Sequence, residues 1–225
     1  MAAARRGVSS KGFSTKPPHS SPFGISQRPS HFTLHDAASQ LATERLASFE
    51  SEGSIPVYAI LSHRWEDDEV TFHEVDSQDP AVKEKKCYRK LRYACEEAQK
   101  QGIAWVWVDT CCIDKRSSAE LSEAINSMFT WYRNAAVCYA FISDSVIFNS
   151  TIPQLDQFKA SKWFTRGWTL QELLAPTIVL FYSAEWAPLG SRETLSQTIT
   201  EVTGIDDDYL RGKDLRHASV AKRMS

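Results

Sequence analysis

The chain has 225 residues, of which 42% are hydrophobic and 24% charged, and its formal net charge is -2, an ordinary composition for a globular domain. Residues 1–35 contain five basic and no acidic side chains, so the rest of the chain is more acidic than the total indicates. This acidic remainder disfavours general nucleic-acid binding by the folded part. No apolar run reaches the roughly 18 residues that cross a bilayer, and no secretory signal is visible. We therefore expect a cytoplasmic protein without membrane contact.

The N-terminal quarter of the chain divides into two predicted segments. Residues 1–30 are basic and rich in Ser and Pro, with too little apolar content to pack, which predicts a disordered arm. Their acid-free, Arg- and Ser-rich character leaves mitochondrial targeting open. Over 31–56 we predict a short helical segment, with Leu41, Leu46 and Phe49 as its apolar residues. The main domain is expected over 57–225, with a C-terminus cut short at Ser225.

From residue 57 onward, short apolar runs alternate with segments of helical period. The apolar runs predict buried strands at 57–61, 103–108, 137–142 and 178–182. Helices are predicted over 81–101, after the capping pair Ser117 and Glu120, over 165–174 from a Thr165 cap, and over 192–202. This alternation predicts an α/β fold with an open, mostly parallel sheet and helices on both faces.

Polar side chains follow the predicted strands at the point where each strand ends. In an open parallel sheet, side chains just past the carboxyl ends of strands line the ligand crevice. We expect these side chains to share one pocket with the tryptophan and the glutamate of the helix predicted over 165–174. The candidate substrate-binding residues are Ser62, His63, Arg64, Trp65, Asp109 and Trp168.

Glu172 is the candidate catalytic residue on that helix. Helical spacing predicts that Trp168 and Glu172 share a face, while Leu170 and Leu173 point to the core. An aromatic ring beside the carboxylate would form a stacking wall. The alternative is that Glu172 pairs with Arg166 or with Arg64, and that Trp168 is a core residue.

Three further candidate residues carry polar groups suited to a nucleotide, and two of them also have plain structural interpretations. Arg64 has the planar guanidinium that suits bidentate phosphate contact. His63 is either a general base or a side chain that satisfies a loop. Asp109 either binds ribose hydroxyls or caps the next turn.

The five cysteines are an odd number and lack the paired spacing of a zinc site. Adjacent Cys111 and Cys112 point to opposite faces if the strand continues, so they suit neither one metal nor one disulfide. The sequence therefore predicts reduced, mostly buried thiols, no metal site and no bound cofactor.

Four blocks of the sequence, in this order, resemble the fungal heterokaryon incompatibility (HET) domain. They are YAILSH at 58–63, WVDTCCIDK at 107–115, AELSEAINSM at 119–128 and WFTRGWTLQEL at 163–173. The resemblance runs from about residue 57 to the end of the chain, and departs from the family at Glu66, where Gly is frequent. It implies an effector of non-self recognition in filamentous fungi, which triggers regulated cell death when incompatible partners meet.

HET domains are in turn remotely similar to TIR domains, and Trp168 to Leu173 fits the Trp-x-x-x-Glu-Leu element of those domains. The similarity implies a flavodoxin-like or TIR-like sheet. Enzymatic TIR domains cleave the nicotinamide glycosidic bond of NAD with the Glu that matches Glu172, so NAD is implied as a substrate rather than a cofactor. A homo-oligomer or a protein partner is also implied. The alternative is a non-catalytic, self-associating signalling or scaffold module.

Overall fold

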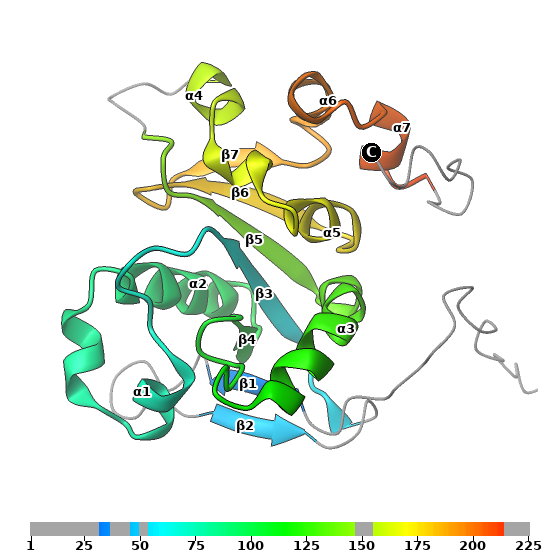
Figure 1. Ribbon diagram of the computed structural model, residues 1–225. Helices are drawn as coiled ribbons and strands as arrows, with labels where there is room; N and C mark the ends of the chain where they lie inside the picture. Colours follow the sequence, from blue (N-terminus) through cyan, green and yellow to red (C-terminus); the bar gives the residue numbers. More distant parts are fainter. Residues whose placement is uncertain (1–31, 37–45, 50–53, 147–154, 214–225) are drawn as a thin grey trace, which may run out of the picture.

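The computed structural model of the protein describes residues 32–36, 46–49, 54–146 and 155–213 (Figure 1). The arm predicted over 1–30 lies outside these residues, as does the C-terminal stretch from 214 to 225.

The described residues form a seven-stranded sheet in the order β2-β1-β4-β3-β5-β6-β7. Its strands are β1 (Phe32–Asp36), β2 (Leu46–Phe49), β3 (Tyr58–His63), β4 (Trp105–Trp107), β5 (Val137–Ile142), β6 (Val179–Ser183) and β7 (Pro188–Ser191). The central strands β4, β3, β5 and β6 pair in parallel, and these are the four strands predicted from the apolar runs. Antiparallel pairing adds β1 and β2 at one edge and β7 at the other, and these three strands were not predicted.

The helices lie on both faces of the sheet, as predicted. They are α1 (Phe72–Asp76), α2 (Tyr88–Lys100), α3 (Ser118–Asn134), α4 (Leu155–Lys159), α5 (Thr169–Leu174), α6 (Ser196–Thr203) and α7 (Asp207–Leu210), with the 3-10 helices η3 (Pro80–Glu84) and η4 (Lys162–Thr165). Figure 1 shows α2 on one face of the sheet and α3 with α5 on the other. Every residue of β3 and β5 is buried between these layers, which explains why both strands read as continuous apolar runs.

One of the two helix caps predicted from the sequence, Ser117 and Thr165, is present in the structure. Ser117 caps α3 as predicted, since its Oγ accepts a hydrogen bond from the backbone N–H of Glu120. The predicted Thr165 cap is wrong, because Thr165 is the last residue of η4 and α5 begins only at Thr169. The hydroxyl of Thr165 donates backward to the carbonyl of Lys162 instead. The helix that carries Glu172 is therefore a short one.

The helical segment predicted over 31–56 is wrong where the structure describes it. Phe32–Asp36 and Leu46–Phe49 are antiparallel strands, and β1 pairs with β4 through His35 and Asp36. Leu34 is completely buried in this arrangement. The free edge of β4 offers the hairpin backbone partners that no local pattern reveals, and this tertiary pairing overrides a weak helical signal. Leu41 lies outside the described residues.

Candidate functional site

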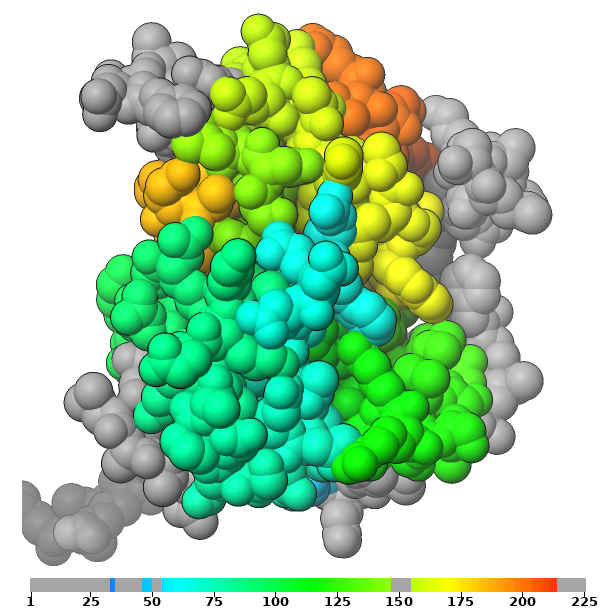
Figure 2. All heavy atoms as spheres, turned by 60° about the vertical axis from the view of Figure 1, so that its left-hand side comes forward, coloured from blue at the N-terminus to red at the C-terminus, as the bar shows by residue number. Residues whose placement is uncertain are grey.

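The candidate site lies at the carboxyl end of β3, where Ser62 and His63 are both buried. Successive side chains of a strand point to opposite faces, so Ser62 turns toward α5 and His63 toward the α2 side. The segment that follows β3, cyan in Figure 2, lies between the teal region around α2 and the yellow region around α5. Strand order also reverses here, because β4 lies on one side of β3 and β5 on the other. Such a switch point is where open α/β sheets bind ligands.

On the α5 side, Glu172 is the centre of a hydrogen-bonded group that we call the Glu172 cluster: Ser62, Trp163, Arg166 and Glu172. The hydroxyl of Ser62 donates to Glu172 Oε2 at 2.7 Å and accepts from Trp163 Nε1 at 2.9 Å. The guanidinium of Arg166 donates to both carboxylate oxygens, at 3.0 Å and 3.2 Å. This bidentate geometry is the strong form of the Arg–carboxylate pair. Ser62 and Glu172 are thus in direct contact, as expected, while the ligand pocket that they were expected to share stays a prediction.

The Glu172 carboxylate is sealed inside this cluster. Glu172 is only 3% exposed, and the more accessible Arg166 lies over it. Burial raises the pKa of Glu172, and the Arg166 charge and the Ser62 hydrogen bond offset that rise only in part. The pairing of Glu172 with Arg166, one of the two alternatives from the sequence, is the arrangement that the structure has.

The predicted helix faces are wrong for Leu170 and for the place of Trp168 beside Glu172, but they are right for the buried Leu173. Trp168 is 46% exposed and Leu170 is 41% exposed, while Glu172 is buried together with Leu173. Trp168 is therefore neither a stacking wall against Glu172 nor a core residue. Periodicity assigns apolar side chains to the core, but here a charged pair with Arg166 turns the glutamate inward.

On the α2 side, His63 lies among charged groups that we call the His63 cluster: His63, Glu69, Lys90 and Asp109. His63 Nε2 is 3.6 Å from Glu69 Oε2 and 3.8 Å from Asp109 Oδ1. Neither ring nitrogen has a hydrogen-bond partner among the described residues. The buried ammonium of Lys90 contacts the Glu69 carboxylate and the carbonyl of the half-buried Arg64. A fully buried imidazole is thus held between two carboxylates.

Trp65 and Asp109 form a contact at the surface beside the His63 cluster. Trp65 Nε1 donates to Asp109 Oδ2 at 2.6 Å, and Lys115 Nζ lies 3.3 Å from the centre of the indole ring. Asp109 therefore orients Trp65, and neither the capping nor the ribose interpretation had included this contact. The exposed indole is held in one orientation by two charged side chains.

Four members of these clusters were not among the predicted site residues: Trp163, Glu69, Lys90 and Arg166, of which only Arg166 had been considered, as an alternative partner of Glu172. Lys90 had a usable signal, because it lies one turn from Cys87 and Ala94 on the inward side of α2, where a charge needs a partner. Glu69 follows β3 in a polar connection and has no distinguishing local pattern. Trp163 belongs to one of the HET-like blocks but carries no spacing that points to Ser62.

The His63 cluster makes acid stability depend on Glu69. Burial alone would raise the pKa of Glu69, but the nearby His63 imidazole and the Lys90 ammonium outweigh it, and the pKa falls to about 2 from an ordinary 4.5. A carboxyl with a lowered folded-state pKa stabilises the fold above about pH 4.5 and loses that contribution as the pH falls toward 2.

We expect Glu69→Gln to remove this dependence. Between pH 4.5 and 2 the unfolding free energy should fall more steeply in the wild type than in Glu69→Gln, as measured by urea denaturation across the range. The exposed Glu201→Gln serves as the control and should follow the wild type. Parallel pH profiles for wild type and Glu69→Gln would contradict the assignment.

The described residues contain no group of three His, Cys, Asp or Glu side chains that could hold a metal ion. All five cysteines are free and buried, which confirms the thiol prediction. Cys111 and Cys112 both lie in the turn after β4, where the thiol of Cys112 accepts a hydrogen bond from the N–H of Val108. Within the described ranges, no helix has the length and apolarity needed to span a membrane.

Comparison with known proteins gives two matches. Residues 58–155 match the sequence model of a family described as "Heterokaryon incompatibility protein (HET)". Over 178 residues, which is 77% of the chain, the sequence is 48% identical to "Vegetative incompatibility protein HET-E-1" of Podospora anserina. The chain spans 13% of the length of that relative. No solved structure matches the chain.

Proposed function

The chain belongs to the heterokaryon incompatibility (HET) family, and we propose that its domain is an effector of fungal non-self recognition that triggers regulated cell death. The 48% identity to a vegetative incompatibility protein supports this role. The identity extends over 77% of this chain and 13% of the relative, so the proposal concerns this domain rather than the whole of a longer protein.

We further propose that the fold is flavodoxin-like in the manner of TIR domains. Numbered by their position in the chain, the parallel strands β4-β3-β5-β6 have the order 2-1-3-4, with the reversal beside β3. This order is that of flavodoxin-like sheets, which bind ligands at the same reversal. The antiparallel strands at the edges leave this central order unchanged.

The proposed mechanism is hydrolysis of the nicotinamide glycosidic bond of NAD, with Glu172 as the catalytic carboxylate. The observation that carries it is the direct contact of Ser62, at the end of β3, with Glu172 on α5. When the bond from ribose C1′ to the nicotinamide nitrogen breaks, positive charge develops on the ribose, and a carboxylate stabilises that charge. Water then adds to C1′ and loses a proton, which yields nicotinamide and ADP-ribose.

In the resting arrangement both oxygens of the Glu172 carboxylate accept hydrogen bonds from Arg166, so the carboxylate is not free to contact the ribose of NAD. We therefore propose that turnover follows displacement of Arg166 when copies of the domain, or the domain and a partner, assemble. A buried ion pair that must open before reaction also explains how a lethal activity stays silent in a single copy.

The test is nicotinamide release from NAD by the purified protein over a range of protein concentrations. Wild type should release nicotinamide at high concentration, and Glu172→Gln, which keeps the shape of the side chain, should lower the rate by about a hundredfold or more. Glu201→Gln, an exposed glutamate on α6, is the matched control and should keep full activity. Equal release from wild type and Glu172→Gln would remove Glu172 from the mechanism.

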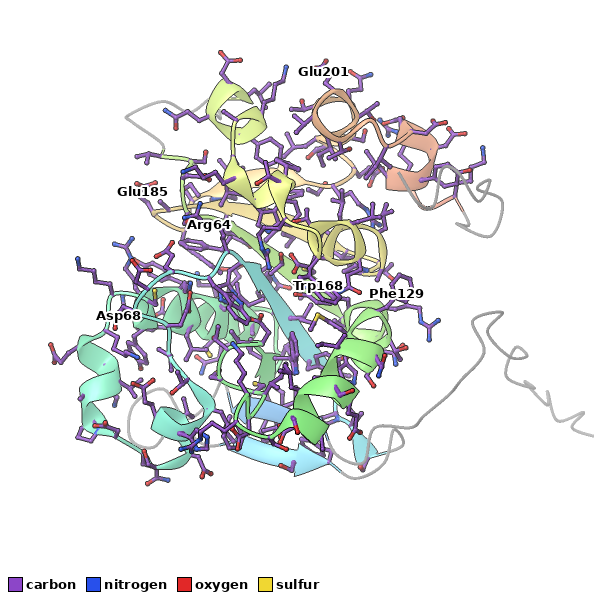
Figure 3. All side chains as sticks on the ribbon, viewed as in Figure 1. Arg64, Asp68, Phe129, Trp168, Glu185 and Glu201 are labelled. Atoms are coloured by element: carbon purple, nitrogen blue, oxygen red, sulfur yellow. The ribbon has the colours of Figure 1, made fainter. Side chains whose placement is uncertain are left out.

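The alternative function, a non-catalytic self-associating module, is favoured by a different observation. Phe129 and Ile125 on α3, and Trp168 at the start of α5, are exposed on neighbouring helices (Figure 3). Cell death in a fungal host separates the two functions. Death that survives Glu172→Gln and is lost in Phe129→Asp would favour association without chemistry.

A further inference from the structure

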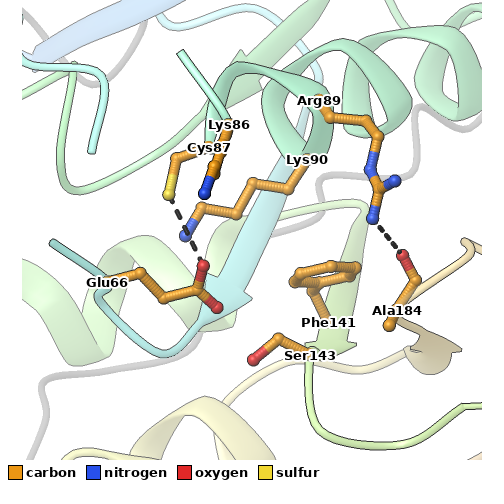
Figure 4. A pocket seen from close by; sticks show the side chains of 8 residues that line it. All are labelled: Glu66, Lys86, Cys87, Arg89, Lys90, Phe141, Ser143 and Ala184. Atoms are coloured by element: carbon orange, nitrogen blue, oxygen red, sulfur yellow. Dashed lines mark hydrogen bonds between the residues drawn. The ribbon is translucent and has the colours of Figure 1, made fainter. Parts of the chain in front are cut away.

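A small hollow of about 100 Å³ opens on the α2 side of the sheet, between the start of α2 and the turns that follow β5 and β6 (Figure 4). Four polar side chains line it, from the start of α2 with the residues just before it and from the turn after β5: Lys86, Arg89, Lys90 and Ser143. Phe141, Ala184, Cys87 and Glu66 complete its wall, and the Cys87 thiol donates to the Glu66 carboxylate. It lies at the carboxyl end of β5, beside the reversal of strand order, where open α/β sheets bind ligands.

This hollow is separate from the Glu172 cluster. On β5, the thiol of Cys138 donates to the carbonyl of Glu172, so Cys138 faces α5. Phe141 is three positions further along the strand and therefore faces the opposite side, where its ring lies 5.7 Å from that of Trp186. The two sites are thus on opposite faces of one sheet.

Positive charge prevails around the hollow. The Lys90 ammonium is already committed to Glu69 and to the carbonyl of Arg64. Arg89 uses one guanidinium nitrogen for the carbonyl of Ala184 at 3.0 Å, which fixes the group at the rim and leaves its other donors. Lys86 adds a second cation, and Glu66 supplies the opposing charge.

The wall behind Phe141 is built rigidly. Trp186 has a left-handed backbone with φ of 62°, a conformation that a bulky residue adopts only when its surroundings enforce it. Its indole stacks on Tyr182 at 4.6 Å and on Tyr93 of α2 at 5.7 Å. The aromatic stack therefore holds α2 and the turn after β6 in fixed positions on either side of the hollow, which lowers the ordering cost of binding.

We propose that this hollow binds the phosphate group of a phosphorylated ligand. A protein cavity of about 150 Å³ holds one benzene molecule, so about 100 Å³ admits a group of a few heavy atoms and is too small for a whole nucleoside. Arg89 and Lys86 supply the charged donors that recognise a phosphate, and the hydroxyl of Ser143 supplies a neutral one. The rest of the ligand extends into solvent. The proposal is independent of hydrolysis at Glu172.

The test is calorimetric titration of the full chain with inorganic phosphate, AMP and adenosine at constant ionic strength. Phosphate and AMP should bind and adenosine should not. Arg89→Gln and Lys86→Gln should each weaken binding by about tenfold or more. Lys83→Gln, an exposed lysine of η3 outside the hollow, is the matched control and should bind as the wild type does.

Glu66→Gln separates phosphate binding from a purely structural role of Arg89 and Lys86, because only a binding site should gain affinity from this change. Removal of the opposing carboxylate should tighten phosphate binding severalfold. AMP that binds more tightly than inorganic phosphate indicates a nucleotide ligand, and equal affinity indicates free phosphate. The proposal is overturned if phosphate and AMP bind no better than chloride, or if adenosine binds as AMP does. It is also overturned if Arg89→Gln and Lys86→Gln match Lys83→Gln, or if Glu66→Gln leaves the affinity unchanged.

Discussion

Glu172→Ala should lower the unfolding free energy by about 3 to 5 kcal/mol, because removal of one partner leaves a largely buried Arg166 without its counter-charge. The same change takes away the acceptor for the Ser62 hydroxyl at the end of β3. Glu172→Gln keeps one oxygen acceptor and the shape of the side chain, so its loss should be smaller. Urea denaturation at neutral pH measures all three proteins.

A surface pair gives the control for this prediction. Lys159 and Glu201 are 2.6 Å apart, but Glu201 is 62% exposed, so Glu201→Ala should leave stability unchanged within error. Replacement of both members of the buried pair, as Arg166→Met with Glu172→Leu, should recover much of the loss. If Glu172→Ala behaves like Glu201→Ala, the buried pair does not hold α5 against β3.

Arg192→Met should cost a similar amount, about 3 to 4 kcal/mol. Arg192 follows β7, is buried, and donates to the carbonyls of Leu173, Pro176 and Thr177 at 2.8 to 2.9 Å. These carbonyls lie at or just past the end of α5, where the helix no longer satisfies them. Methionine fills the space but leaves three carbonyls without this donor, two of them buried, and hydrogen bonds to a charged group contribute about 1.5 to 3 kcal/mol each without adding fully.

The matched control for Arg192 is an exposed arginine on another helix. Arg133→Met, in the last turn of α3, should change stability by less than about 0.5 kcal/mol. Arg192→Lys should fall between the two, because a single ammonium lacks the planar fork that reaches three carbonyls. Chemical denaturation gives the order of the variants. A loss in Arg192→Met no larger than that in Arg133→Met would contradict the proposed role at the end of α5.

The sequence predicts the parallel core of this fold and misses its edges, for a physical reason. Strands β3 and β5 are covered on both faces, so nearly all of their side chains are buried and their sequences are almost continuously apolar. Strands β1, β2 and β7 have only four or five residues; β1 joins the sheet through β4, which is distant in the chain, and β7 pairs with β6 in an irregular register. No local period records that kind of pairing.

The position of the candidate site in the fold could be predicted from the sequence, but the contacts among its side chains could not. That Ser62 and Glu172 meet follows from topology, since both lie where the strand order reverses. That Trp168 lies outside while Glu172 lies inside depends on the charge of Arg166, six residues before Glu172. The spacing in the sequence allows Glu172 to pair with either Arg166 or Arg64, and only the three-dimensional packing decides between them.

The short strand β7 has a consequence for how copies of this protein can meet. It is the outermost strand on its side of the sheet, and the exposed Pro188 has no N–H to offer an incoming chain. Edges of this kind resist cross-β growth into fibrils. Association along this side is therefore expected to use side-chain surfaces more than backbone pairing, which makes it more selective for sequence.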